Sequence, residues 1–404
     1  MSETIVRLAL DSIRDSRGQW TVEATVELDG GASGRAGAPS GASTSHFEAQ
    51  AFPDGGVPVA LERFRSLVAP RLVGLSAADL GSVDAALHEV DGTPNFSRIG
   101  GNTATAVSVA TAIASARARR EPLWKRLARP GVEGRAFPAI VGNCLNGGRH
   151  AIGGPDIQEF IAFADGPTPD ASIDAAVAVH RWIGEELHRR LPTVALGRGD
   201  EGGWVAPIGN VDALELLARA CDAVRDATGV PVYPGLDLAA SEFFRDGRYR
   251  YREQTLDTDG QIGFVTELVD RYGIRYLEDP IEESDYEGFA RVTAEVGPRT
   301  LVVGDDLYAT SPARVERGIA ARATNAVLLK VNQIGTLTDT MATDERTRSA
   351  GWSSVVSHRS GEVPEGWLAH VAVGLEARAL KCGVLGGERV AKLNELLRLG
   401  RATP

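Results

Sequence analysis

The chain of 404 residues contains little cysteine and no long apolar run. Its three cysteines, Cys144, Cys221 and Cys382, are too few and too scattered for a disulfide framework. No stretch approaches the roughly 18 consecutive apolar residues of a membrane-spanning helix. The first residues also lack the basic start and apolar run of a signal peptide. These absences predict a cytoplasmic protein with reduced thiols.

Positive charge is also in short supply, because the formal net charge is −11. Nucleic-acid phosphates would be repelled over most of such a surface, so we expect neither a nucleic-acid nor a membrane partner. A small anionic ligand remains compatible with this charge, since a local basic cluster or a metal ion inverts the local field.

Lysine is the scarcest of the charged residues. All the other basic residues are arginines, and the four lysines are Lys125, Lys330, Lys381 and Lys392. Arginine stays protonated and is a poor base, whereas the pKa of a buried lysine can be lowered. Lysines kept in such a chain are therefore candidates for proton transfer.

The apolar pattern divides the chain into two parts. Residues 5–13 and 20–28 alternate with period two, which predicts antiparallel strands, and helical patterns follow them. Together they predict an N-terminal α+β domain over residues 1–130, with a mobile loop of small residues at 40–44. Residues 131–404 alternate short apolar runs with helical stretches, which predicts a parallel sheet with helices outside. The predicted fold class is α/β, with the α+β domain capping a (β/α)8 barrel.

Polar side chains follow the apolar runs of this second part at the points where the runs end. They are Asp237, Glu278, Asp305, Lys330, His358, Arg359, Ser360 and Lys381. In a barrel the C-terminal ends of the strands converge on one mouth, where catalytic groups lie. A single acid at a strand end is more often a helix cap or a surface group. The series as a whole is what predicts a site.

These residue types suit one chemistry. Asp237, Glu278 and Asp305 offer hard oxygen ligands that suit Mg²⁺, and no Cys/His cluster has zinc spacing. Lys330, beside a cation and another lysine, is expected to have a lowered pKa and to take a proton. Arg359 could hold a phosphate together with the neighbouring serine.

Long motifs along nearly the whole chain resemble those of the enolase family. They are DSRG at 15–18, PSGAST at 39–44, NGG at 146–148, DIQEF at 156–160, GDEGG at 199–203, ASEF at 240–243, EDP at 278–280, GDDL at 304–307, LKVNQIG at 329–335 and SHRSGE at 357–362. The resemblance implies an enolase-type barrel and a homodimer. It also implies an enzyme that takes the C2 proton from 2-phosphoglycerate and eliminates water to give phosphoenolpyruvate.

The resemblance also assigns roles and a cofactor, which is Mg²⁺, two per active site. Asp237, Glu278 and Asp305 would bind the first ion, and Ser43 on the mobile loop the second. Lys330 would be the base, and Glu201, with Glu159, would help the C3 hydroxyl leave. The other catalytic candidates are His150, His358 and Lys381, and the substrate-binding candidates are Arg359, Ser360, Gln158 and Ala42.

Several segments depart from the family pattern near the expected mouth. They are Gln19-Trp20, residues 45–48, residues 53–56, Val363-Pro364 and residues 382–384. This pattern is typical of a specialised paralogue, because remote contacts can change the accepted substrate while the central chemistry stays the same.

Three hypotheses about the function follow from these observations. The first is a Mg²⁺-dependent enolase. The second is an enzyme of the carboxyphosphonoenolpyruvate synthase type, which would combine the same site with a CMP-activated phosphonoformate in phosphonate biosynthesis. The third, and least favoured, is a non-catalytic scaffold.

Overall fold

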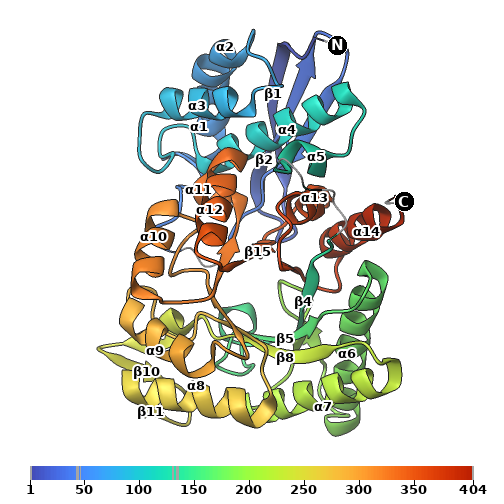
Figure 1. Cartoon of the computed structure of the whole chain (residues 1–404), viewed down its shortest axis with the longest axis vertical. Helices are drawn as coiled ribbons and strands as arrows, with labels where there is room; N and C mark the ends of the chain where they lie inside the picture. The colour runs from blue at the N-terminus through green and yellow to red at the C-terminus, as the bar shows by residue number, and fades with distance from the viewer. Residues whose placement is uncertain (1, 42–44, 46, 130–131, 133–135, 403–404) are drawn as a thin grey trace.

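The computed structural model describes residues 2–41, 45, 47–129, 132 and 136–402 (Figure 1). The N-terminal part is a three-stranded antiparallel sheet in the order β1-β2-β3. Its strands are β1 (Ile5–Arg14), β2 (Trp20–Leu28) and β3 (Ser33–Gly37), so the period-two prediction is confirmed there. Figure 1 shows this sheet and its helices at one end of the molecule and the barrel at the other.

Helices cover one face of the N-terminal sheet. The long, alanine-rich α4 (Gly101–Arg119) packs directly on β2 and β3, and most of its residues are buried. A Cβ atom added at Gly34 would lie 2.0 Å from the carbonyl oxygen of Ala110, so this close approach requires glycine. The other helices of this part are α1 (Gly56–Arg63), α2 (Ala69–Leu72), α3 (Leu80–Asp91) and α5 (Leu123–Leu127).

Eight strands close into a barrel in the second part, since β16 pairs with β4. They are β4 (Ala139–Asn146), β5 (Glu159–Ala164), β8 (Val232–Asp237), β12 (Tyr276–Glu278), β13 (Leu301–Gly304), β14 (Ala326–Leu329), β15 (Ser353–Ser357) and β16 (Ala379–Lys381). Apolar side chains such as Val141, Ile161, Val303 and Val355 fill the interior, as in other closed barrels. The predicted fold class is confirmed.

One strand departs from the predicted parallel arrangement. β5 runs antiparallel to both of its neighbours, β4 and β8. The connection from β4 to β5 is only residues 147–158 and holds a single 3-10 turn at Gly148–His150. A connection without a crossover helix joins antiparallel strands, so the uniformly parallel prediction was wrong at β5. As a result, the first residue of β5, and not its last, lies at the mouth.

Helices surround the barrel. They are α6 (Pro169–Arg190), α7 (Asn210–Thr228), α8 (Thr258–Tyr272), α9 (Tyr286–Val296), α10 (Pro312–Ala321), α11 (Val331–Ile334), α12 (Leu337–Ser349), α13 (Trp367–Gly374) and α14 (Gly387–Ala402). Some of them, such as α11 and α13, also pack against helices of the N-terminal part. A hairpin of β6 (Gly197–Arg198) and β7 (Trp204–Val205) pairs with the C-terminal end of β4, beyond the residues of β4 that pair with β16. A small separate sheet holds β9 (Phe244–Arg245), β10 (Arg248–Arg250) and β11 (Thr255–Leu256). None of the described helices is long and apolar enough to cross a membrane.

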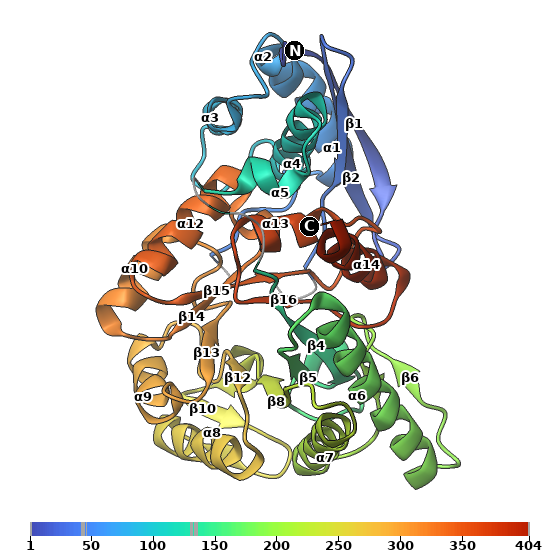
Figure 2. The ribbon, with the colours of Figure 1, turned by 45° about the vertical axis from the view of Figure 1, so that its right-hand side comes forward.

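The segment after β3 connects the N-terminal part to the barrel mouth (Figure 2). Ser40 and Gly361 exchange two backbone hydrogen bonds of 2.6 and 2.8 Å. The Asn332 side-chain amide donates to the Pro39 carbonyl at 2.9 Å, and the Ala49 N–H donates to the Gln333 carbonyl at 2.7 Å. These hydrogen bonds place the segment against α11, which follows β14, and against the loop after β15. The three cysteines are all buried and free.

Candidate active site

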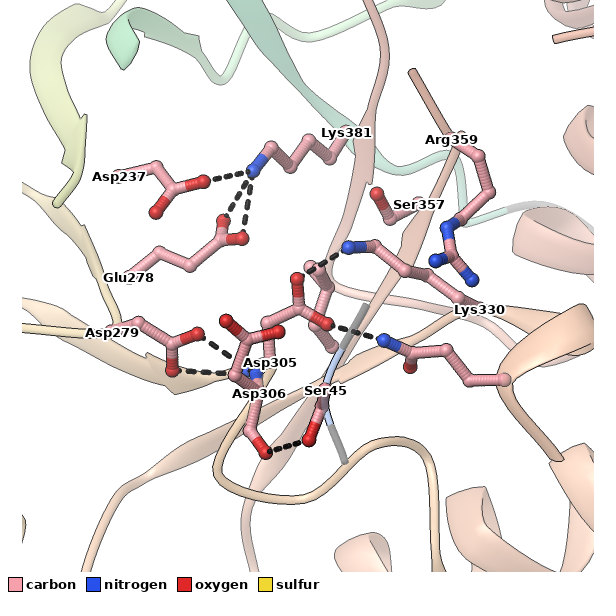
Figure 3. Close-up of polar contacts among 12 residues, drawn as sticks. Ser45, Asp237, Glu278, Asp279, Asp305, Asp306, Lys330, Ser357, Arg359 and Lys381 are labelled. Atoms are coloured by element: carbon pink, nitrogen blue, oxygen red, sulfur yellow. Dashed lines mark hydrogen bonds and ion pairs between the residues drawn. The ribbon is translucent and has the colours of Figure 1, made fainter. Parts of the chain in front are cut away.

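The strand-end residues meet at one mouth, as the barrel prediction requires. Asp237, Glu278 and Lys381 are the last residues of their strands, while Asp305 and Lys330 follow directly after theirs. Figure 3 shows their side chains converging from different strands. Asp237, Asp305, Lys330 and Lys381 line a partly open cavity of about 30 Å³, whereas Glu278 lies behind Lys381 and does not line it. The predicted site residues that line it are Gln158, Glu159, Glu201, Asp237, Asp305, Lys330, His358, Arg359, Ser360 and Lys381.

Lys381 is held by a ring of acids. Its Nζ lies 2.9 Å from Asp237 Oδ2, 2.7 and 2.8 Å from the two Glu278 oxygens and 3.1 Å from Glu159 Oε2. Burial alone would lower the pKa of Lys381, but the three carboxylates outweigh it and hold the pKa well above its usual value. Lys381 is therefore a fixed positive charge, suited to holding an anionic group rather than to taking a proton.

Lys330 forms an ion pair with Asp305 across the cavity. Burial lowers the pKa of Lys330, and so do Arg359 and Lys381, but the Asp305 carboxylate raises it above its ordinary value on balance. The predicted lowering of the Lys330 pKa assumes a bound cation beside it, and the protein groups by themselves raise the pKa because Asp305 is paired with Lys330. Lys330 becomes a base only when Asp305 is engaged by another cation.

The mouth carries more acid than base. Burial and mutual repulsion raise the pKa of Glu278, of Asp279 and of Asp306 well above their ordinary values. Asp279, Asp305 and Asp306 form a group whose ligand oxygens lie within 4.8 Å of one another. A cluster of three hard oxygen donors, two of them buried and Asp305 paired with one lysine, fits a divalent cation such as Mg²⁺.

The compact acidic group differs in membership from the predicted metal ligands. Asp305 belongs to both sets, whereas Lys381 engages Asp237 and Glu278. Asp279 and Asp306 were not among the predicted site residues. The signal was present in the printed sequence, since each follows directly after a predicted ligand.

Glu201 is another acid that lines the same cavity as Lys330. Glu201 lies in the tight turn between β6 and β7, and its Oε2 is 2.9 Å from Nε2 of His358. The Asn143 side-chain amide donates to the same oxygen at 3.3 Å. Burial lowers the pKa of His358 to about 4, so the imidazole is neutral near pH 7 and serves as a hydrogen-bond partner of Glu201.

Arg359 is the buried cation nearest the N-terminal part. Its guanidinium donates to Asn332 Oδ1 at 2.9 Å and to Glu48 Oε2 at 2.8 Å. Burial lowers the pKa of Arg359, but the Glu48 carboxylate outweighs it and raises the pKa above its usual value. Arg359 and the neighbouring Ser360 are thus placed to hold a phosphate at the cavity wall. Neither partner of Arg359 was among the predicted site residues.

Three predicted site residues cannot be placed. Ala42 and Ser43, with the middle of the predicted mobile loop, lie outside the described residues, and so does the side chain of His150. Gln158 is described and donates to Asp237 Oδ2 at 3.4 Å.

The fold and this site define a class of enzyme, a capped (β/α)8 barrel whose mouth combines lysines with carboxylates. Residues 5–127 match the model of the enolase N-terminal domain, and residues 135–402 match that of the enolase C-terminal TIM barrel domain. The chain belongs to the enolase family.

Curated relatives match the chain over its whole length. It is 45% identical over 410 residues to the enolase of Methanothermobacter thermautotrophicus, covering 100% of the chain and 98% of that protein. It is 43% identical over 398 residues to the enolase of Halorubrum lacusprofundi, covering 98% of each. It is 40% identical over 399 residues to the enolase of Thermoplasma acidophilum, covering 99% of the chain and 98% of that protein.

Proposed function

We propose that this chain is an enolase, a carbon–oxygen lyase that dehydrates 2-phosphoglycerate to phosphoenolpyruvate. The observation that supports the proposal is that Lys330 and Glu201 line the same cavity. With Asp305 engaged by a cation, Lys330 would take a proton, and Glu201 would give one. The full-length match to curated enolases supports the same reaction.

The residues divide the substrate among them. Arg359 and Ser360 hold the phosphate, and the fixed charge of Lys381 neutralises the carboxylate. Lys330 removes the C2 proton, and the electron pair of that C–H bond forms the C2–C3 double bond. The C3–O bond breaks, and the hydroxyl leaves as water after taking a proton from Glu201, with Glu159 beside it.

We further propose two Mg²⁺ ions per site as the cofactor, because the acids outnumber the bases at the mouth. Asp237, Glu278 and Asp305 would hold the first ion, and Ser43 would contribute to the second. Asp279 and Asp306 lie close enough to Asp305 to support the cluster. Bound Mg²⁺ supplies stabilisation of the negative charge that develops when the C2 proton leaves.

A homodimer and a cytoplasmic location complete the proposal, and both follow from the family resemblance. Light scattering of the purified protein, at concentrations on either side of the dissociation midpoint, tests the dimer. A monomer at every concentration would remove that part of the proposal.

The central experiment supplies the purified protein with Mg²⁺ and 2-phosphoglycerate. Enol absorbance follows the product, and NMR in D₂O follows exchange of the C2 proton. Rapid formation of phosphoenolpyruvate supports the enolase reaction. Neither exchange nor product, with bound metal verified, would overturn it and favour the non-catalytic scaffold.

The phosphonate hypothesis keeps one specific observation in its favour. An outer cavity of about 640 Å³ adjoins Arg359, and several of the residues that depart from the family pattern line it, among them Trp20, Ser45 and Pro53. Such a cavity has room for a second, larger substrate. The curated relatives give this hypothesis no support, since those matched here are enolases. Proton exchange without dehydration, followed by product formation on adding CMP-activated phosphonoformate, would favour it.

A further inference from the structure

Arg389 is a buried arginine that no part of the proposed reaction uses. It lies on α14, its side chain is 0% exposed, and it is among the largest fully buried side chains of the described residues. Its nearest carboxylate, Glu388, approaches only Nε, at 3.3 Å. A buried cation surrounded mainly by carbonyl groups is costly unless its geometry serves a purpose.

The first contact of Arg389 is with the imidazole of His358. A guanidinium has donors only, so the 2.9 Å contact between Arg389 Nη1 and His358 Nδ1 makes Nδ1 the acceptor. The Gly383 N–H also points at Nδ1, at 3.4 Å. Two donors aimed at Nδ1 place the imidazole proton on Nε2, the atom that lies 2.9 Å from Glu201 Oε2. Arg389 therefore selects the tautomer that gives Glu201 a hydrogen-bond donor.

The remaining contacts of Arg389 join two loops of the mouth. Its guanidinium donates to the carbonyls of Arg359 and Ser360 at 2.5 and 2.6 Å, in the loop after β15. It also donates to the carbonyl of Asp200 at 3.0 Å, in the turn that carries Glu201. One side chain thus fixes the loop that holds the phosphate relative to the turn that holds the acid.

We propose that Arg389 is a positioning residue for the elimination step, acting through His358 on Glu201. This inference rests on the proposed enolase function. The hydrogen bonds of Lys330 go to Asp305 and Thr310 and not to Arg389, so we expect removal of the C2 proton to depend on Arg389 much less than the elimination does. The two half-reactions therefore separate the inference from a general loss of structure.

The first test substitutes Arg389→Gln and measures both half-reactions. We expect dehydration to fall on the order of a hundredfold, the scale of a misplaced general acid, while C2 proton exchange stays within about threefold of wild type. Arg389→Lys keeps the positive charge but loses the planar set of guanidinium donors, so its dehydration rate should lie between those of Arg389→Gln and the wild-type protein. The matched control is Arg398→Gln, an exposed arginine on the same helix, which should leave both rates unchanged. Equal loss of exchange and dehydration in the Arg389 variants would overturn the inference.

A second test uses a side chain whose donor does not depend on a tautomer. In His358→Gln the amide can donate to Glu201 whatever Arg389 does. Adding Arg389→Gln to that variant should then cost less than threefold in dehydration. A further loss as large as the single Arg389→Gln effect would contradict a role through His358.

A third measurement needs no substitution at Arg389 and holds even if its variants fail to fold. Long-range ¹⁵N–¹H spectra of histidine-labelled wild-type protein distinguish an Nε2-protonated from an Nδ1-protonated ring. We expect His358, assigned by its absence in His358→Gln, to be Nε2-protonated at neutral pH. An Nδ1-protonated ring in an active enzyme would overturn this inference alone, whereas a wild-type protein without activity would defeat the proposed function instead.

Discussion

The Glu48 carboxylate lies 2.8 Å from the Arg359 guanidinium, and both side chains are almost fully buried. Glu48 also accepts a 3.2 Å hydrogen bond from Gln333, whose amide donates to Asp305 at 2.9 Å. A residue of the N-terminal part is thus linked to Arg359 directly and to Asp305 through Gln333. Glu48 balances the pull that Asp305 and Asp306 exert on Arg359.

Removing the charge of Glu48 should weaken substrate binding. In Glu48→Gln we expect Arg359 to turn toward the remaining acids, raising KM for 2-phosphoglycerate about tenfold, which is about 1.4 kcal/mol, with little change in kcat. Steady-state kinetics measure the split. Glu345→Gln, an exposed acid on α12, is the matched control. A fall in kcat with unchanged KM would contradict this view of Glu48.

Lys330→Ala should abolish exchange of the C2 proton. No other described lysine is placed to replace it, because Lys381 is held by three acids. The loss should reach at least about 100-fold, the usual scale of a general base. NMR in D₂O measures it, with Lys125→Ala, an exposed lysine, as the control. Exchange at the wild-type rate in Lys330→Ala would remove the assignment of the base.

Mg²⁺ should stabilise the fold as well as support the reaction. The buried acids Glu278, Asp279 and Asp306 repel one another, and a cation bound to them relieves that repulsion. At 100 times the dissociation constant, the free energy of unfolding should rise by about 2.7 kcal/mol. Urea unfolding with Mg²⁺ and with a chelator measures the difference, which Asp305→Asn should reduce sharply. Superimposable curves for the wild-type protein would speak against a resident cation.

Acid should destabilise the protein partly through His180. Its imidazole is 2% exposed, stacks on Trp204 and contacts the Gly202 carbonyl at 2.9 Å. Burial lowers the pKa of His180 to about 4, from about 6.5 in the unfolded chain. The unfolded state therefore binds the extra proton first. The contribution of His180 is complete above about pH 6.5 and is lost as the pH falls to about 4, up to about 3 kcal/mol.

The measurement for His180 is the free energy of unfolding in urea at about pH 7.5 and about pH 4.5. His180→Gln keeps a donor without the titration, so its stability should fall less between the two pH values. His188→Gln changes the other histidine beside Trp204 and should behave as the wild-type protein does. An equal fall in the free energy of unfolding between the two pH values, in the wild-type protein and in His180→Gln, would show that His180 does not contribute to the acid sensitivity.

The sequence predicted the mouth because barrel topology turns strand ends into neighbours. Locating the strands was enough to predict Asp237, Glu278 and Lys381 as site residues, because each is the last residue of its strand. This rule did not predict Glu159, because Glu159 is the first residue of the antiparallel strand β5. Only the family resemblance identified it as a site residue. Helix α13 gives little sequence signal, because almost all its residues are buried and no amphipathic period results.

The sequence did not predict which charged side chains pair with one another within the mouth. Whether Lys381 or a metal ion meets Glu278 depends on separations of a few ångströms, which no spacing in the chain encodes. Arg389 was missed for a related reason. It lies on a helix outside the barrel, and only folding brings its guanidinium to His358.

The distribution of lysine gives the protein a single accessible side-chain amine. Lys381 and Lys392 are buried and Lys330 lies within the mouth, so Lys125 on α5 is the lysine that reaches solvent. A support that couples through lysine amines would therefore hold each molecule by its capping part. Every immobilised copy would present its barrel in the same orientation, without any engineered tag.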